Sequence, residues 1–231
     1  MTITATERID GVLVVHLDDG KANALSKQMI GEIVAAVDVA ESDEDISAVV
    51  LHGREGKFSA GFDLTVMGGN DLTAIIDLVA AGGDLVRRLY GSSVPIVAAC
   101  TGHALAAGAL MLLGCDARVG ADIDCKIGLN EVAISMVLPD WAITIAIDRL
   151  SKRHLQRSVA NARITDARGA VDAGFLDEAV PAELVLDRAI EIARSFAALD
   201  RRAYAGTVQK VRGSVLSEMA EEIAHDRAAI A

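Results

Sequence analysis

Short apolar runs and stretches with helical spacing of apolar residues alternate along this chain. Val12–Leu17 is apolar on both faces, as is typical of a strand buried inside a layered fold. Ala48–Leu51, Val94–Cys100 and Ala117–Gly120 are further short runs of the same kind. We therefore predict a strand at each of these four places.

The segments between the runs carry apolar residues at helical spacing. Ser26 can cap one helix, a long helix is predicted near Leu72–Tyr90, and a short one at Ala106–Gly114. Further helices are expected near Pro139 and from Pro181, and the C-terminal segment reads as helical and charged. Strands that alternate with helices predict an α/β fold with parallel strands.

The chain offers one weak boundary, because strand signals stop near residue 180 and only helices follow. No repeat at a fixed period and no low-complexity linker is visible. We therefore divide the chain into a core, residues 1–195, and a C-terminal helical region, residues 196–231.

Gly91–Cys115 contains no formal charge and is long enough to span a membrane. Pro95, Gly102 and Gly108 interrupt it, however, and such residues break a continuous helix. We predict a strand, a turn and a helix in a soluble core rather than a membrane span.

Amino-acid composition and net charge limit the kinds of binding partner that this protein can have. The 231 residues are 52% hydrophobic and 24% charged, which excludes a disordered chain. Aromatic residues make up only 3%, so few rings are available to stack on bases. The 33 acidic and 22 basic residues give a net charge of −11, which would repel phosphate backbones. Nucleic acid is therefore not an expected partner.

The three cysteines, Cys100, Cys115 and Cys125, form no C-x-x-C pair and leave an odd count. A disulfide framework or a zinc site would need a different pattern, so reduced, buried thiols are the simpler interpretation. Residues 1–11 lack the apolar stretch of a secretory signal. We expect a cytoplasmic protein without a metal site.

Two segments rich in small residues follow predicted strands. These are Phe58–Leu64 and Gly102–Gly108, and the second leads into a helix. Small side chains leave backbone N–H groups approachable, and two N–H groups that converge on one oxygen would form an oxyanion hole. Tight packing of a helix on a sheet through small residues is the alternative. Neither a P-loop nor a G-x-G-x-x-G motif is present.

Three ordered segments resemble the crotonase superfamily, which includes enoyl-CoA hydratases and isomerases. They are Lys21-Ala22-Asn23-Ala24-Leu25, Phe58–Leu64, and Gly102–Gly108 with Cys115-Asp116 after it. The similarity covers about residues 8–195, and the chain looks like one of the short actinobacterial-type members labelled enoyl-CoA hydratase. It implies a spiral of ββα units and a C-terminal helical region that mediates homotrimers or a dimer of trimers. It also implies that an acyl-CoA thioester is the substrate, with no separate cofactor.

The resemblance assigns the two oxyanion N–H groups to Phe62 and Ala107. Family members usually carry glycine at the second position; the methyl group of Ala107 narrows the pocket and demands a negative φ. Lys21, Arg54 and Lys57 are candidate partners for the phosphates of CoA, or else ordinary solvated cations. The resemblance places the CoA groove along Lys21, Ala22, Ala24, Ala60, Asp63 and Leu64.

The reaction depends on two positions. Family hydratases use two glutamates, and here the first position is Leu110 while the second is Glu131. A leucine neither holds nor deprotonates water, whereas Δ3,Δ2-enoyl-CoA isomerases of the family keep only the second glutamate. We therefore favour double-bond migration with Glu131 as the base, in an apolar pocket expected from residues 132–137. A hydratase, a non-catalytic acyl-CoA-binding protein and a merely surface-exposed Glu131 are the alternatives.

Two further residues have both a functional and a structural interpretation. Asp140 stands about where some family members carry a catalytic aspartate, but it is also a natural first-turn helix residue after Pro139. His103 could donate to a ligand beside the second oxyanion segment, although a packed or solvent-touching histidine is the simpler interpretation.

Overall fold

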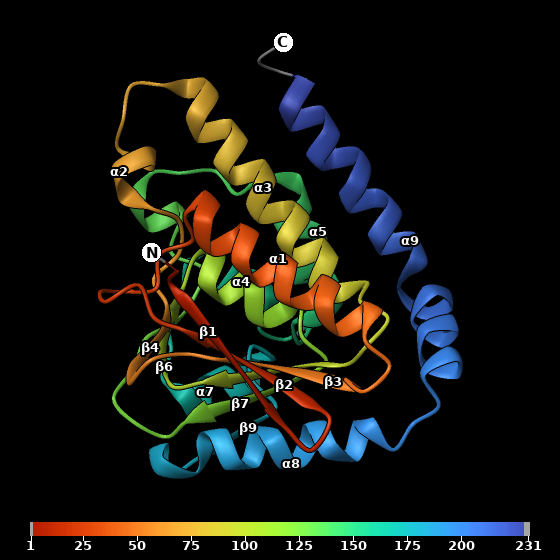
Figure 1. Cartoon of the computed structure of the whole chain (residues 1–231). Coiled ribbons are helices and arrows are strands. Elements are labelled where there is room, and N and C mark those ends of the chain that lie inside the picture. The colour runs from red at the N-terminus through yellow and green to blue at the C-terminus, as the bar shows by residue number, and fades with distance from the viewer. Residues whose placement is uncertain (1, 229–231) are drawn as a thin grey trace.

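The computed structural model describes residues 2–228, which form one six-stranded and one three-stranded sheet (Figure 1). The larger sheet has the order β1-β2-β3-β5-β7-β9 and is parallel except for the β1–β2 pair. The smaller sheet, β4-β6-β8, is parallel throughout. The strands are β1 Thr4–Ile9, β2 Val12–Leu17, β3 Ala48–His52, β4 Gly56–Ser59, β5 Ile96–Cys100, β6 Gly102–Leu105, β7 Ala117–Ala121, β8 Ile127–Gly128 and β9 Glu178–Val180.

Each of three successive units gives one strand to each sheet and then forms a helix. The units are β3-β4 with α2 and α3, β5-β6 with α4, and β7-β8 with η1 and α5. This arrangement is the spiral of ββα units that the resemblance implies. The helices are α1 Lys27–Ser42, α2 Leu64–Met67, α3 Leu72–Tyr90, α4 Ala107–Leu113, η1 Val132–Ile134, α5 Asp140–Arg149, α6 Leu155–Ser158, α7 Ala167–Ala173, η2 Ala182–Leu184, α8 Val185–Ala197 and α9 Arg201–Ala228.

Helices cover both faces of the larger sheet. Figure 1 shows α8 beneath it and α1, α3 and α4 above it. A small apolar cluster between the sheet and α8 includes Val14, Val50 and Val97. The other face belongs to the main core, in which α9 packs along α3 and α5. Burial on both faces explains why the central strands read as continuous apolar runs.

The predicted helices and strands are confirmed, and the sequence missed others. The Ser26 hydroxyl accepts a hydrogen bond from the Met29 amide at 3.2 Å, and Asp71 caps α3 in the same way. The missed strands are β1, β4, β6, β8 and β9, which are peripheral or only a few residues long. Residues 91–115 form β5, β6 and α4, and no helix within residues 2–228 is long and apolar enough to cross a bilayer.

Two glycines allow backbones to approach closely where the sheets meet. A Cβ atom on Gly102 would lie 2.1 Å from the carbonyl oxygen of Gly56, and one on Gly108 would lie 2.4 Å from that of Ser59. No side chain fits in either place, because real Cβ contacts are never this short. Gly108 therefore holds the first turn of α4 against the end of β4.

The C-terminal segment is tied to the rest of the molecule. Leu216, Met219 and Ile223 of α9 are buried in the same apolar cluster as residues of α3 and α5. Helix α8 ends at Ala197 and α9 begins at Arg201, close to the predicted boundary at residues 195 and 196. The division into two regions and the role of the second in trimer formation stay predictions.

Candidate active site

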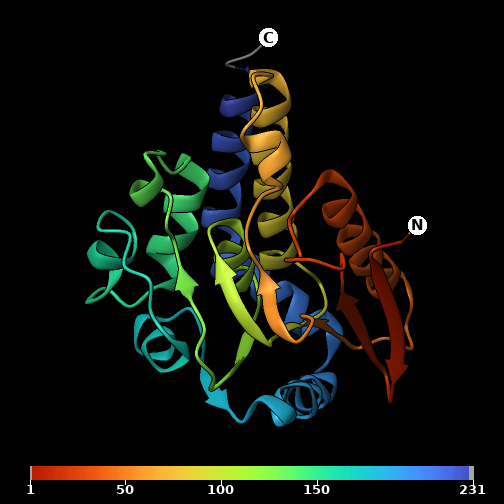
Figure 2. The same cartoon turned by 90° about the vertical axis from the view of Figure 1, so that its left-hand side faces the viewer.

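The candidate site lies beyond the carboxyl ends of the three strands of the small sheet. Phe62 comes three residues after β4, Ala107 two residues after β6, and Glu131 three residues after β8. Figure 2 shows these three strands side by side and pointing the same way. Because the carboxyl ends of parallel strands meet at one edge of a sheet, Phe62, Ala107 and Glu131, three of the four predicted catalytic residues, follow the same edge of the small sheet.

The Phe62 amide points away from the neighbouring chain segment. The Gly61 carbonyl accepts a hydrogen bond from the Leu25 amide at 2.8 Å, and the Asp63 amide donates to the Leu25 carbonyl at 3.3 Å. In a planar trans peptide the C=O and N–H groups point in opposite directions, so the Phe62 N–H is turned away from Leu25. Within residues 2–228 it donates to no backbone acceptor.

The Ala107 amide is oriented in a similar way. The Ala106 carbonyl accepts from the amides of Ala109 and Leu110, at 2.9 and 3.1 Å, and therefore points along α4. The Ala107 N–H consequently points out of the start of the helix, and it too has no acceptor among the described residues. Ala107 has a negative φ, as predicted, and the positive φ of 50° falls instead on Ala106.

The two amides are neighbours. A Cβ atom on Gly61 would lie 3.5 Å from the Ala107 nitrogen and 3.0 Å from the Ala106 Cβ. Gly61 has a φ of +94°, a conformation that side chains rarely adopt. The glycine therefore lets the two oxyanion segments touch, and two free N–H groups lie within one small region.

Glu131 is a buried carboxylate without a counter-charge. The residue is 8% exposed, and its Oε2 atom is buried with no hydrogen-bond partner among the described residues. Burial raises the pKa of the carboxyl above its usual range, opposed only by a hydrogen bond from its own backbone N–H. The Oδ1 atom of Asn130 is also buried and unpartnered. The sequence interpretation did not single out Asn130, although it adjoins the matched glutamate.

The source of the apolar surroundings of Glu131 was predicted wrongly. Val132, Ile134, Met136 and Val137 are exposed, between 37% and 90%, because η1 and the loop after it run along the surface. Residues 132–137 therefore do not enclose the carboxylate. Leu110, at the other glutamate position of the family, is 2% exposed and belongs to the main apolar core.

The structure does not bring Asp140 into this group. It is an exposed first-turn residue of α5, and its charge helps to raise the pKa values of Glu222 and Asp226, in which burial is the largest cause. It is not among the charges that shift the pKa of Glu131. His103 is partly exposed on β6, and its Nδ1 accepts a hydrogen bond from the Lys126 amide at 2.9 Å.

The residues predicted to line the CoA groove lie on two adjoining segments. The Ala60 amide donates to the Ala22 carbonyl at 3.0 Å, which joins the loop after β2 to the loop after β4. Asp63 caps α2, and Leu64, its first residue, is 79% exposed. The set brought together is Lys21, Ala22, Ala24, Ala60, Asp63 and Leu64.

Three cations gather at the same loop. The Lys21 carbonyl accepts from Arg54 Nη1 at 2.8 Å and from Lys57 Nζ at 3.2 Å. The Asp19 carboxylate accepts hydrogen bonds from three amides of this loop, those of residues 21, 23 and 24. Burial would raise the pKa of the Asp19 carboxyl, but these hydrogen bonds lower it below its usual value. Arg54 also pairs with Asp18 at 3.4 Å, so Lys21, Arg54 and Lys57 lie at one loop together with Asp18 and Asp19.

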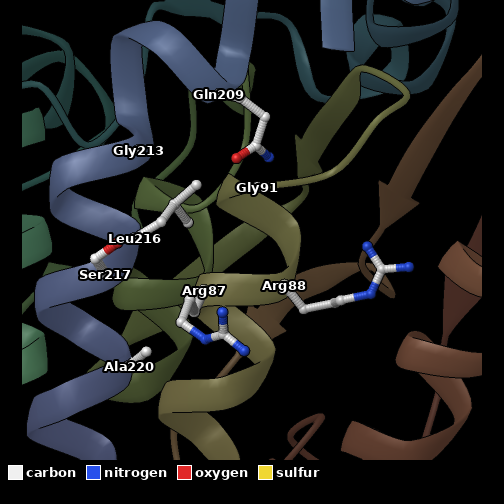
Figure 3. A pocket seen from close by; sticks show the side chains of 8 residues that line it. All are labelled: Arg87, Arg88, Gly91, Gln209, Gly213, Leu216, Ser217 and Ala220. Atoms are coloured by element: carbon white, nitrogen blue, oxygen red, sulfur yellow. The ribbon is translucent and has the colours of Figure 1, made fainter. Parts of the chain in front are cut away.

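A separate groove of about 300 Å³ lies between α3 and α9 (Figure 3). Arg87 and Arg88 of α3 and Gln209 of α9 are among its lining residues, the Arg88 side chain points away from α9, and none of the predicted site residues lines the groove. Among residues 2–228, no group of three or more His, Cys, Asp or Glu side chains is arranged to hold a metal ion, and the three cysteines are buried and unpaired.

Comparison with known proteins places the chain in a family. Residues 7–229 match the enoyl-CoA hydratase/isomerase family. Enoyl-CoA delta isomerase 1, mitochondrial, of Rattus norvegicus is 32% identical over 181 residues, which are 78% of this chain but only 63% of that protein. The 2,3-dehydroadipyl-CoA hydratase of Escherichia coli is 27% identical over 98% of this chain and 88% of its own length.

A solved structure agrees along almost the whole chain. The apo structure of an enoyl-CoA isomerase from Mycobacterium tuberculosis superposes with a TM-score of 0.92 and 37% sequence identity, over 98% of each chain. Isomerases and hydratases thus both occur among similar proteins. With its two free amides beside the small sheet and its matched sequence, the chain belongs to the enoyl-CoA hydratase/isomerase family.

Proposed function

We propose that the protein is a Δ3,Δ2-enoyl-CoA isomerase. Glu131 removes a proton from C2 of a 3-enoyl thioester, the double bond moves from C3–C4 to C2–C3, and the same carboxyl returns the proton at C4. The Phe62 and Ala107 amides hold the negative thioester oxygen of the dienolate between the two proton transfers. The observation that carries the proposal is the buried carboxylate of Glu131, whose Oε2 atom has no hydrogen-bond partner among the described residues, with leucine at the other acid position.

The environment of Glu131 suits a proton shuttle. A carboxylate in water is too weak a base for a carbon acid, and burial without a counter-charge raises its pKa. The unpartnered Oε2 atom leaves one oxygen free to accept the proton. No second carboxylate is needed, because the proton taken from C2 is the one delivered to C4.

Leu110 distinguishes this reaction from hydration. Addition of water requires groups that hold and deprotonate it, and two glutamates serve that purpose in the hydratases that the chain resembles. A leucine at 2% exposure has no polar atom on its side chain to do so. Loss of one member of an acid–base pair costs about 10²–10⁴-fold in rate.

The surroundings of the site suit an acyl chain. The segments that directly follow the catalytic residues expose several large apolar side chains to solvent. Leu64 and Leu72 lie at the starts of α2 and α3, whereas Val132, Ile134 and Val137 lie on and after η1. Exposed apolar groups that follow the proposed catalytic residues along the chain favour an apolar ligand.

Assays with two substrates test the proposal. The wild type should convert 3-enoyl-CoA to 2-enoyl-CoA much faster than it hydrates 2-enoyl-CoA, and kcat should fall as the pH drops below the raised pKa of Glu131. Glu131→Gln should lose about 10²–10⁴-fold in kcat while it still binds a saturated acyl-CoA. Glu221→Gln, at an exposed position of α9, is the matched control and should behave as the wild type.

The alternatives give different outcomes. Efficient hydration of 2-enoyl-CoA without any shift of 3-enoyl-CoA would make the protein a hydratase and refute the isomerase assignment. Binding of acyl-CoA without turnover of either substrate, and without any effect of Glu131→Gln, would indicate a non-catalytic acyl-CoA-binding protein.

A further inference from the structure

Two consecutive glycines lie in the middle of α3, where helix propensity alone disfavours them. Gly82 and Gly83 lie within a continuous helix of 19 residues, which is amphipathic and is capped at its start by Asp71. Glycine is the weakest helix former after proline, so a pair in a helix interior calls for a reason in the packing.

The first glycine receives an aromatic ring. A Cβ atom on Gly82 would lie 2.4 Å from both Cε1 and Cζ of Phe62. The tip of the Phe62 ring therefore rests on the bare backbone of α3 at Gly82. Phe62 supplies one of the two proposed amide donors, and its N–H is turned away from Leu25, so a contact on α3 bears on that donor.

The second glycine serves a different contact. A Cβ atom on Gly83 would lie 2.9 Å from Ile223 Cγ1 of α9 and 2.9 Å from Trp141 Cε2 of α5. The absence of a side chain at Gly83 thus lets α9 and α5 pack closely against α3. Gly82 meets a different neighbour, because the three atoms nearest to a Cβ atom there all belong to the Phe62 ring.

We infer that Gly82 is a positioning residue for the oxyanion hole: it seats the Phe62 ring and so fixes the orientation of the Phe62 amide. The inference rests on the proposed function, in which this amide holds the thioester oxygen. Gly82 itself does not touch the substrate in this scheme.

The backbone around Phe62 needs such an anchor. The peptide between residues 61 and 62 is held by one hydrogen bond, from the Leu25 amide to the Gly61 carbonyl at 2.8 Å, and the next peptide is held by a longer one, from the Asp63 amide to the Leu25 carbonyl at 3.3 Å. Gly61 on its other side carries no Cβ atom, so its backbone dihedrals are less restricted than those of other residues. The ring, packed against the core at Gly82, is a further restraint on rotation of this peptide.

A methyl group at Gly82 should displace the ring and turn the amide. We expect Gly82→Ala to lower kcat between about 10- and 100-fold with little change in KM, because a misaligned oxyanion donor weakens transition-state binding most. Gly206→Ala in α9 is the matched control, since a Cβ atom there meets nothing within 4 Å. Its kcat should equal that of the wild type.

A second change should rescue the first. Phe62→Leu removes the two ring atoms that a methyl group at residue 82 would strike, yet keeps the amide. Phe62→Leu alone should lower kcat moderately, and adding Gly82→Ala to it should cause no further fall. A purely structural role of Gly82 would give additive effects, or would change the melting temperature and leave kcat as it is.

Ligand binding gives a readout that does not depend on turnover. Acetoacetyl-CoA binds as its enolate where an oxyanion hole is intact, whereas butyryl-CoA carries no such charge. The ratio of the two affinities, measured by calorimetry, should fall at least tenfold in Gly82→Ala and stay unchanged in Gly206→Ala.

The outcomes separate the inference from the proposed function. Gly82→Ala could have the kcat of the wild type and the same ratio of affinities for acetoacetyl-CoA and butyryl-CoA, in an enzyme that is otherwise active. That result would overturn the positioning role alone. Wild-type hydration in place of isomerisation would refute the proposed reaction but leave the affinity ratio as a test of Gly82. A wild type that binds neither ester would overturn both.

Discussion

Asp116 and Arg212 form an ion pair of 2.7 Å that joins the start of β7 to α9, with side chains only 9% and 13% exposed. The same Asp116 Oδ1 accepts a hydrogen bond from the Tyr204 hydroxyl at 2.9 Å, and Oδ2 accepts one from the Ile96 amide at 2.8 Å. The guanidinium of Arg212 also lies over the Tyr90 ring. One carboxylate therefore ties the C-terminal helix to the larger sheet.

Removal of that carboxylate should be costly. Asp116→Ala leaves the Arg212 charge buried and uncompensated, so we expect the free energy of unfolding to fall by about 3–5 kcal/mol. Chemical denaturation measures the change. Asp122→Ala is the control, because its partner Arg168 is 79% exposed and such a pair contributes about 0–1 kcal/mol. Similar small losses in both variants would mean that apolar packing alone holds α9.

Glu131 should lower stability at neutral pH. Its pKa is raised in the folded protein by burial, so the unfolded chain ionises more readily and folding becomes less favourable as the pH rises above the unfolded pKa. Glu131→Gln should therefore be more stable than the wild type at pH 7 to 8. The gain should shrink as the pH falls from the raised pKa of the folded protein toward 4.5, and it should vanish below that, where both states are protonated. Denaturation curves at several pH values measure this, and a gain that is independent of pH would contradict it.

Ala106 carries a strained backbone next to the oxyanion donor. Its φ of 50° and ψ of −124° are unfavourable for a residue with a Cβ atom. Ala106→Gly should raise the free energy of unfolding by about 1 kcal/mol, the relieved strain exceeding the added freedom of the unfolded chain. Ala109→Gly, inside α4 and fully buried, should instead lower it by at least about 1 kcal/mol. Thermal denaturation compares the two, and a loss in both would show that residue 106 is not strained.

The basic side chains at the Lys21 loop should recognise the nucleotide end of CoA. Arg54→Ala or Lys57→Ala should raise KM for an enoyl-CoA about tenfold, because a charge-assisted contact to phosphate is lost. The same variants should change KM little for an enoyl-pantetheine thioester, which lacks the nucleotide. Steady-state kinetics with both substrates measure this. An equal rise with both thioesters would show that the two side chains only support the Lys21 loop.

His52 should make the protein sensitive to acid. Burial, and next the charge of His16, lower the pKa of His52 to about 4. The Nδ1 atoms of the two rings are 2.9 Å apart, and Glu7 lies 3.6 Å from the other nitrogen of His16. Since the unfolded chain takes up the proton near pH 6.5, stability should be lost as the pH falls from about 6.5 to 4.

His52→Gln should remove much of this loss. Denaturation at pH 7 and pH 5 should show a smaller difference in the variant than in the wild type, whereas His225→Gln, exposed on α9, should match the wild type. An identical pH dependence in all three proteins would place the acid sensitivity elsewhere.

Local patterns sufficed for the larger elements. Helix α3 was predicted over its full range, Leu72–Tyr90, because its apolar stripe continues between the Asp71 cap and Gly91. Strand β2 was predicted at both ends for a similar reason, since its apolar run stops at Asp18. The strands of the small sheet were not predicted. Strands β4, β6 and β8 have four, four and two residues, too few to show an alternation of apolar and polar side chains.

The candidate site, too, was predictable from the sequence only in part. Phe62, Ala107 and Glu131 were identified from ordered motifs, and their placement beyond neighbouring strands agrees with that identification. The expected apolar shell from residues 132–137 was wrong, and the packing of Phe62 on Gly82 went unnoticed. Both depend on which segments meet in space.

By itself the sequence determined the chemical groups available to this protein and the helices and strands that carry them, because capping and periodicity act within a few residues. Only the tertiary structure decided where the Phe62 and Ala107 amides point and how deeply Glu131 is buried. Amide direction follows from hydrogen bonds such as Leu25 to Gly61, and desolvation from the packing of distant segments. Neither quantity is a property of any short stretch of chain.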